Sequence, residues 1–202
     1  MDPQLPSRTL SPAPPTLKLA FPHSWEAEIL STRPLIKPQR SYTYPRVAEE
    51  IERGALEVMV QPAGHAPQFL ATFALGFADP VAPTGLWSCP NPDDLCAVAG
   101  GYAYIVNTLD PASFTHIAFR PVFQPLPLPD RNLLLFAGHQ ALLAWGPRGQ
   151  AWQTRRLSSE GIRVTEMRGD KLHGFGWDLL RDREVPFIVN LRTGETHQPV
   201  SD

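Results

Sequence analysis

The fold is decided by residues 133–195, which read LLLFAGHQALLAWGPRGQAWQTRRLSSEGIRVTEMRGDKLHGFGWDLLRDREVPFIVNLRTGE. Short apolar segments alternate here with polar turn signals, such as those at Gly146–Gly149, Ser158–Gly161 and Arg168–Asp170. We expect six short antiparallel strands, because apolar runs spaced about 8–12 residues apart and separated by turns are typical of a meandering all-β architecture.

The same pattern extends toward the N-terminus. Residues 56–75 predict a hairpin with a long loop, and residues 17–21 and 25–29 predict two further strands that pair with each other. Residues 32–45 carry three prolines and predict an extended connector, whereas residues 45–53 predict one short helix with Gly54 after its end. We therefore predict a single all-β domain over residues 17–195, an antiparallel meander of about 12 short strands, with a flexible tail at 1–16 and a polar C-terminal tail at 196–202.

Two hairpins share one pattern, and this raises the question of repeated units. Residues 94–106 and 132–145 both read as an apolar strand, Ala-Gly, two further residues, and a second apolar strand. A four-stranded propeller blade needs about 40–50 residues, so the chain has room for three or four blades. The pattern is equally compatible with a β-sandwich or an open barrel, because β-hairpins share these turn residues.

Composition excludes several classes of partner. The chain has 202 residues, 43% of them apolar and 19% charged, with a net charge of −2. Without a basic stripe we expect no nucleic acid and no anionic membrane surface as partners. Residues 1–20 contain no apolar run before a cleavage site, and no window reaches the about 18 apolar residues of a membrane helix, so we expect a cytoplasmic protein.

Known catalytic and cofactor motifs do not occur. We find no phosphate-binding loop, no dinucleotide fingerprint and no metal-ligand spacing among the six histidines. We therefore expect no cofactor and no metal. Cys89 and Cys96 are separated by six residues, and we expect free thiols, with a local disulfide as the alternative.

The candidate ligand-binding residues lie mainly in the loop-rich region 85–104, because loops on a rigid sheet carry function disproportionately. The candidates are Trp87, Asp93, Asp94, Tyr102, Tyr104, His139, His173 and Asp178. We expect a non-catalytic binding or interaction module for an unknown small molecule or protein, because every catalytic signature is missing. The alternative is a hydrolase-type enzyme whose Asp and His residues, such as Asp94, His139, His173 and Asp178, come from separate loops.

The C-terminal part of the chain resembles a family. The residues that carry the resemblance are Trp152, Thr154, Leu157, Ser158, Gly161, Ile162 and Val164, then Gly174, Gly176, Trp177 and Asp178, and finally Pro186, Phe187, Val189, Asn190, Leu191, Thr193 and Gly194. This spacing is similar to that of uncharacterised bacterial β-repeat, propeller-like proteins. The resemblance implies a β-rich fold and brings with it no known activity or catalytic residue.

Overall fold

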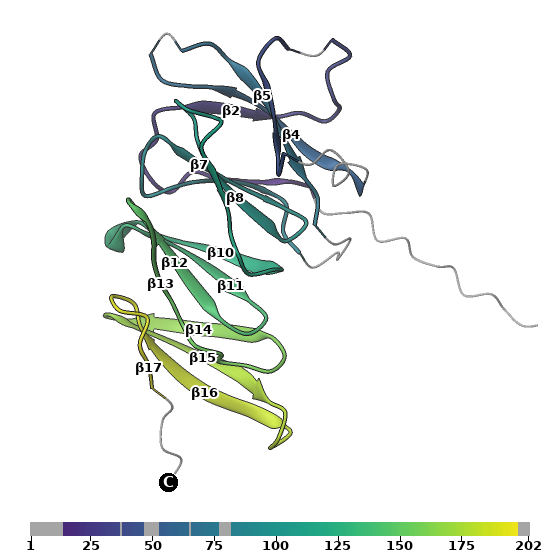
Figure 1. The fold of residues 1–202 in the computed structure, drawn as a ribbon. Coiled ribbons are helices and arrows are strands. Elements are labelled where there is room, and N and C mark those ends of the chain that lie inside the picture. Colours follow the sequence, from purple (N-terminus) through teal and green to yellow (C-terminus); the bar gives the residue numbers. More distant parts are fainter. Residues whose placement is uncertain (1–13, 37, 47–52, 65, 77–81, 198–202) are drawn as a thin grey trace, which may run out of the picture.

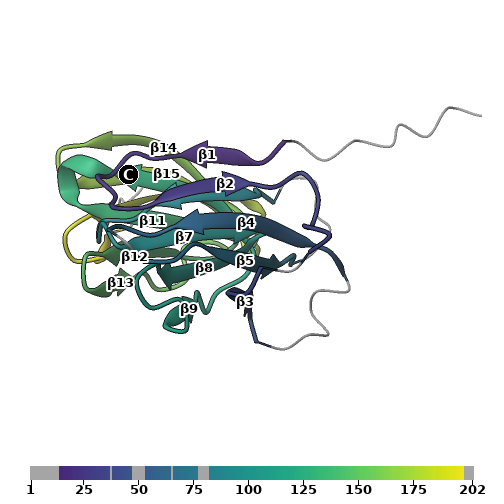
Figure 2. The ribbon, with the colours of Figure 1, turned by 90° about the horizontal axis from the view of Figure 1, so that it is seen from above.

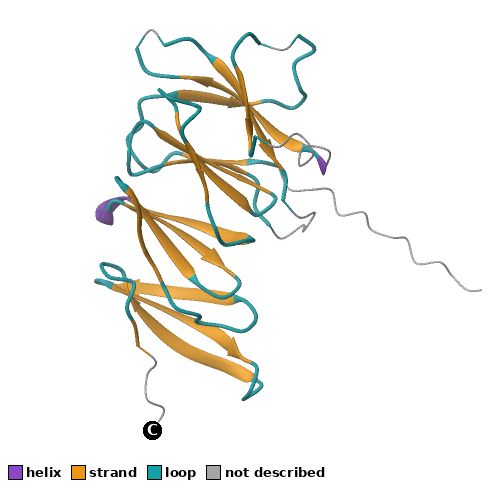
Figure 3. Cartoon of the chain, in the orientation of Figure 1, coloured by secondary structure: helices purple, strands orange, loops and turns teal. Residues whose placement is uncertain are grey.

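The computed structural model describes residues 14–36, 38–46, 53–64, 66–76 and 82–197. This part of the chain forms four β-sheets, which lie face to face along one stack (Figures 1 and 3). We call them blades 1 to 4 in order along the stack. The arrangement is all-β, as the sequence predicts, and it is propeller-like, which is one of the alternatives that the sequence left open.

The four blades follow each other along the chain, except that the first strand, β1, belongs to blade 2 and not to blade 1. Blade 1 has the order β2 (Glu26–Ile29), β4 (Ala55–Gln61), β5 (Phe69–Ala74) and β3 (Ser41–Tyr44). Blade 2 has the order β1 (Thr16–Lys18), β6 (Gly85–Ser88), β7 (Asp94–Ala99), β8 (Tyr102–Asn107) and β9 (Phe114–His116). Blade 3 holds β10 (Val122–Leu128), β11 (Leu133–Gly138), β12 (Leu142–Gly146) and β13 (Gly149–Gln153), with the 3₁₀ turn η2 (Pro129–Arg131) after β10. Blade 4 holds β14 (Ile162–Arg168), β15 (Lys171–Asp178), β16 (Arg183–Asn190) and β17 (Thr196–His197).

Blades 2 and 3 are buried on both faces, and this explains their almost uninterrupted apolar strands. In β7, Leu95 and Ala97 pack toward blade 1, whereas Cys96 and Val98 pack toward blade 3. Successive side chains of a strand point to opposite faces, so a strand covered on both sides needs apolar residues at every position. The two hairpins with matching patterns are β7–β8 and β11–β12, which hold equivalent central places in these two blades. Figure 2, seen along the stack, shows strands of successive blades one behind another.

Blade 4 is covered on one face only, and its strands alternate accordingly. Leu172, Phe187 and Val189 are buried against blade 3. Their neighbours along the strands, such as His173 and Ile188, are only partly buried. Buried and partly buried residues therefore alternate along these strands because only one face of blade 4 packs against another blade.

Four expectations from the sequence need correction or fall outside the described residues. The predicted pairing of residues 17–21 with 25–29 is wrong: β1 pairs in parallel with β6, and β2 pairs with β4. The predicted connector at 32–45 contains a strand, β3, which runs parallel to β5. The predicted helix falls largely on residues 47–52, which lie outside the described residues. In the described parts of the chain, seventeen strands replace the expected dozen, because several strands have only two to four residues.

Packing between the blades predicts that a Leu→Ala substitution changes the free energy of unfolding by very different amounts at a buried and at an exposed position. Leu134 is fully buried between blades 2 and 3, whereas Leu180 is 97% exposed in the β15–β16 turn. We expect Leu134→Ala to lower the free energy of unfolding by about 3 kcal/mol, because it leaves a cavity between two sheets. Leu180→Ala should change it by less than about 0.5 kcal/mol. Urea denaturation measures both values, and equal effects would contradict the stacked core.

Candidate functional site

A pocket opens where blade 2 meets blade 3, and we call it the Asp94 pocket. It has a volume of about 290 Å³. Its lining residues are Asp94, Ile105, Asn107, Asp110, Ser113, Phe114, Thr115 and Trp145. All but Trp145 belong to blade 2, and Trp145 comes from β12 of blade 3.

Strand register explains why these side chains meet. Asp94 begins β7 and pairs with Asn107 at the end of β8, while Ile105 pairs with Thr115 of β9. Cross-strand partners project from the same face of a sheet. Since Cys96 and Ile105 pack toward blade 3, Asp94 and Asn107 lie on that same face, two residues along their strands.

The Asp94 carboxylate is the most unusual ionisable group of the pocket. Its Oδ1 accepts a hydrogen bond from Nδ2 of Asn107 at 3.0 Å. Burial raises the pKa of Asp94 above its ordinary value of 3.8, while hydrogen bonds from Asn107 and Asn91 oppose the rise and the charge of Asp93 adds to it. No Lys, Arg or His is among the residues that line the pocket, so no cation there compensates the carboxylate.

The loop beside the pocket is held by Asn107. Its Oδ1 accepts the backbone N–H groups of Leu109 at 3.1 Å and Asp110 at 3.0 Å. The Thr108 hydroxyl and N–H both donate to the carbonyl of Asp93. Asn107 thus links the Asp94 carboxylate to the loop that supplies Asp110 and Ser113, and the acidic groups are positioned by hydrogen bonds.

The opposite wall is the Trp145 side chain. Trp145 is 7% exposed, and its indole Nε1 is buried without a hydrogen-bond partner among the described residues. A buried N–H without an acceptor is uncommon, because it loses its bond to water without replacement. Trp145 makes the pocket aromatic on one side, opposite its acidic groups, whereas the ring of Phe114 packs against Tyr44 on the other face of blade 2.

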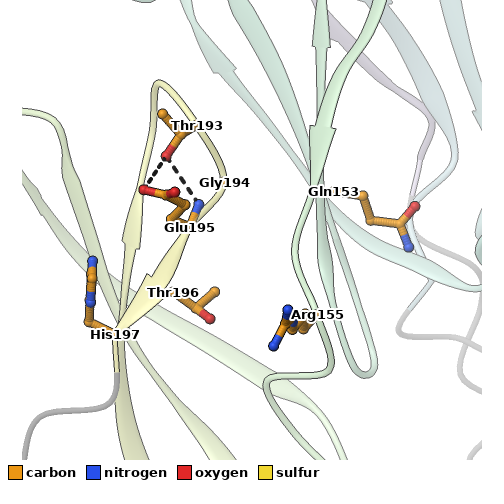
Figure 4. A pocket seen from close by; sticks show the side chains of 7 residues that line it. All are labelled: Gln153, Arg155, Thr193, Gly194, Glu195, Thr196 and His197. Atoms are coloured by element: carbon orange, nitrogen blue, oxygen red, sulfur yellow. Dashed lines mark hydrogen bonds between the residues drawn. The ribbon is translucent and has the colours of Figure 1, made fainter.

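A second pocket lies between blades 3 and 4. It is lined by Gln153, Arg155, Thr193, Gly194, Glu195, Thr196 and His197 (Figure 4). Figure 4 shows Arg155 pointing toward the segment that carries Thr193 to His197, whereas Gln153 points away from it. The Thr193 hydroxyl donates to the Glu195 carboxylate and accepts from its N–H within that turn. These polar groups satisfy each other locally, so the Asp94 pocket is the stronger candidate.

The structure separates the other residues that the sequence singles out. Trp87 lies in the core between blades 2 and 3, and Tyr102 and Tyr104 lie in the core between blades 1 and 2. Asp93 accepts a hydrogen bond from the Ser24 hydroxyl at 2.6 Å, and the ring of His139 packs edge-on against Phe123. His173 lies on the outer face of blade 4, and Asp178 accepts the N–H groups of Leu180 and Arg181 in a turn.

Of the eight candidates, Asp94 alone lines the Asp94 pocket. The Asp and His residues of the enzyme alternative are spread over blades 2, 3 and 4. Sequence reasoning missed Asn107, Asp110, Ser113, Thr115 and Trp145 as pocket residues. One signal for these residues was present in the sequence. Asn107 and Asp110 lie beside the turn at Pro111, and this loop follows the strand that pairs with the strand beginning at Asp94.

His116 is a further titratable group that the sequence did not single out. Its ring stacks on Tyr104 with centroids 4.6 Å apart, and Arg120 lies 3.4 Å from its Nδ1. Burial, and secondarily the charge of Arg120, lowers the pKa of His116 to about 4. The imidazole is thus neutral at pH 7 and packs as an aromatic ring.

The two cysteines are free and fully buried. Burial, with a contribution from the adjacent Cys96 thiol, raises the pKa of Cys89 well above its usual range. A thiol in this state is a poor nucleophile.

In the described part of the chain, no group of three or more His, Cys, Asp or Glu side chains is placed to hold a metal ion. No helix among the described residues is long and apolar enough to cross a membrane.

Comparisons with known proteins add the following. No protein-family model and no curated protein matches the chain. Among solved structures it is similar to the computationally designed Ika8 protein, with 11% identity, a TM-score of 0.40 and coverage of 71% of this chain and 45% of the other. It is also similar to the WD40 β-propeller domain of Doa1, with 14% identity, a TM-score of 0.35 and coverage of 77% and 52%. It is likewise similar to the N-terminal domain of Nup159, with 14% identity, a TM-score of 0.35 and coverage of 92% of this chain and 53% of the other.

The chain thus spans about half the length of these solved chains. Since no family model matches, membership of an uncharacterised bacterial family stays a prediction. The class that the fold defines is a propeller-like stack of four sheets.

The geometry of the pocket predicts how Asp94 titrates. We expect its pKa to lie above 3.8. Asn107→Ala should raise it further, since the lost hydrogen bond favours the charged carboxylate. Asn190→Ala is the matched control, because Asn190 caps a turn in blade 4. The carboxyl carbon signal, followed by NMR across pH, measures each value.

The same shift sets the sign of the pH dependence of stability. Because the pKa is raised in the folded state, the contribution of Asp94 to stability is fully present at low pH and is lost as pH rises through the folded-state pKa. Asp94→Asn removes this dependence. A titration midpoint at or below the ordinary value would contradict the described burial of the carboxylate.

Proposed function

We propose that this protein is a non-catalytic binding module, and that the Asp94 pocket receives an ammonium group, either of a small amine or of a lysine side chain in a partner peptide. The observation that carries the proposal is the half-buried Asp94 carboxylate, which has hydrogen-bond partners but no cation among the residues that line the pocket. A buried charge is stabilised by a partner of opposite charge.

The remaining lining residues suit such a ligand. Asp110 adds a second carboxylate, and Ser113 and Thr115 add hydroxyl acceptors for the three N–H donors of an ammonium group. Trp145 offers apolar surface to an alkyl chain and an aromatic face to a cation. The lining includes no Lys, Arg or His that would repel it.

The pocket offers no machinery for hydrolysis. No histidine lines the pocket beside its two hydroxyl groups, from Ser113 and Thr115, and the ring of the adjacent His116 stacks on Tyr104, so a serine or threonine nucleophile would lack a base within the pocket. The separation of Asp94 from His139 and His173 on different blades also favours binding over the enzyme alternative. The cytoplasmic location expected from the sequence stays a prediction.

NMR titration tests the proposal directly. The indole N–H signal of Trp145, assigned by its loss in Trp145→Phe, is followed while n-butylammonium or Nα-acetyl-lysine methylamide is added. We expect both probes to shift this signal and the Asn107 side-chain amide signals. A tighter response to a lysine peptide than to the free amine would identify a protein partner as the source.

Two neighbouring carboxylates provide a matched pair of variants. Asp94→Asn should weaken probe binding at least about tenfold, because it removes the charge that faces the ammonium group. Asp93→Asn makes the same change in net charge at the preceding residue, but Asp93 is hydrogen-bonded to Ser24 and does not line the pocket. Equal binding by all three proteins, or no shift with either probe, would refute the proposal.

A further inference from the structure

The outer face of blade 4 is a sheet face that no described part of the chain covers. Blades 2 and 3 have a neighbour on each side (Figure 1). Blade 1 closes its outer face with its own polar contacts: the buried Glu57 carboxylate accepts a hydrogen bond from Thr72 at 2.6 Å and forms an ion pair with Arg33 at 3.3 Å. On the outer face of blade 4 the described ion pairs, Arg163 with Glu184 and Arg168 with Glu166, join exposed side chains and bury no carboxylate.

Strand register fixes which side chains share this outer face. They form four rows across the sheet, each row made of cross-strand neighbours. From one end to the other, the rows hold Arg168, Lys171 and Asn190, then Glu166, His173 and Ile188, then Arg163, Phe175 and Pro186, and finally Trp177 and Glu184.

The middle of the face is apolar and its margins are charged. Phe175, Pro186 and Ile188 lie side by side on β15 and β16, and all three are only partly buried. Arg163 covers one edge: its guanidinium carbon lies 4.7 Å from the centroid of the Phe175 ring, and its Nη2 lies 2.6 Å from Oε2 of Glu184. An apolar centre with a charged rim is the usual anatomy of a protein interface.

We propose that a second copy of this chain packs on this face, with blade 4 against blade 4 about a twofold axis. Two sheets packed face to face lie about 10 Å apart, so side chains of opposing rows meet. The axis runs across the strands between the second and third rows. It therefore places the second row of each copy over the third row of the other, and the first row over the fourth.

The charges of the face fit this arrangement. On β14, Arg163 of each copy comes opposite Glu166 of the other, so the interface gains two symmetric pairs of opposite charge. On β15, Lys171 comes opposite Trp177 of the other copy, where a cation can lie over the indole ring. No like charges oppose each other in this register.

The apolar groups match in the same register. His173 comes opposite Phe175 of the other copy, and Ile188 comes opposite Pro186. The same element therefore supplies both sides of each contact, as an isologous interface requires. This match of charge to charge and apolar group to apolar group favours a second copy over an unrelated partner.

The size of the face sets the strength of the association. Strand spacing and rise give roughly 400–500 Å² for the plane of the sheet. That is below the about 800 Å² per partner of a standard stable complex, so we expect a weak dimer with a micromolar dissociation constant. The proposal is independent of the Asp94 pocket, which lies between blades 2 and 3.

Sedimentation velocity over about 5 µM to 1 mM tests the proposal. We expect the weight-average mass to rise from monomer toward dimer with concentration. Arg163→Glu alone and Glu166→Arg alone should each weaken association at least about tenfold, because each places two pairs of like charge across the axis. Two controls make the same changes elsewhere on exposed surface, Arg148→Glu in blade 3 and Glu26→Arg in blade 1, and should dimerise as the wild type does.

Mixing the two variants gives the sharpest outcome. An equimolar mixture of Arg163→Glu and Glu166→Arg should associate again, since both pairs across the axis then have opposite charges. Circular dichroism confirms that each variant is folded before mixing. A wild type that stays monomeric up to 1 mM, a dimer insensitive to both variants, or a mixture that does not recover association would overturn the proposal.

Discussion

Face-to-face packing of the sheets is the constraint on which the rest of the structure depends. Three apolar clusters join the four blades, one at each contact between neighbours. Because a strand presents side chains to both faces, each central blade contributes to two clusters at once. Sheet order, strand composition and the position of the Asp94 pocket all follow from this repeated contact.

The sequence predicted the middle of the stack best. The hairpins β7–β8 and β11–β12 are strongly apolar, with turns that contain glycine, and the Gly100–Gly101 turn has the positive φ angles of 54° and 80° that such a tight connection requires. The hairpin pattern could not separate a sandwich from stacked blades, since β-hairpins in both share the same turn residues. The continuous apolar character of β7 and β11 was the signal that distinguishes them, because it implies cover on both faces.

The short strands at the sheet edges could not be predicted from the sequence. β1 has three residues, all exposed, and it pairs in parallel with β6 far along the chain. β3 lies in a proline-bearing segment and also joins its sheet in parallel. Such strands are defined by backbone hydrogen bonds to a partner that is already in place, and their side chains carry little local pattern. The pocket was found only in part for a similar reason: Asp94 lies in a loop-rich region that the sequence marks, whereas Trp145 reaches the pocket from another blade.

Protection of backbone amides against hydrogen exchange tests the stacked arrangement most directly. If blades 2 and 3 are held on both faces, the amides of β7, β8, β11 and β12 should exchange only through global unfolding, with the free energy measured by denaturation. The amides of β17, at the edge of blade 4, should exchange much faster by local opening. Equally fast exchange in β7–β8, β11–β12 and β17 would contradict the account.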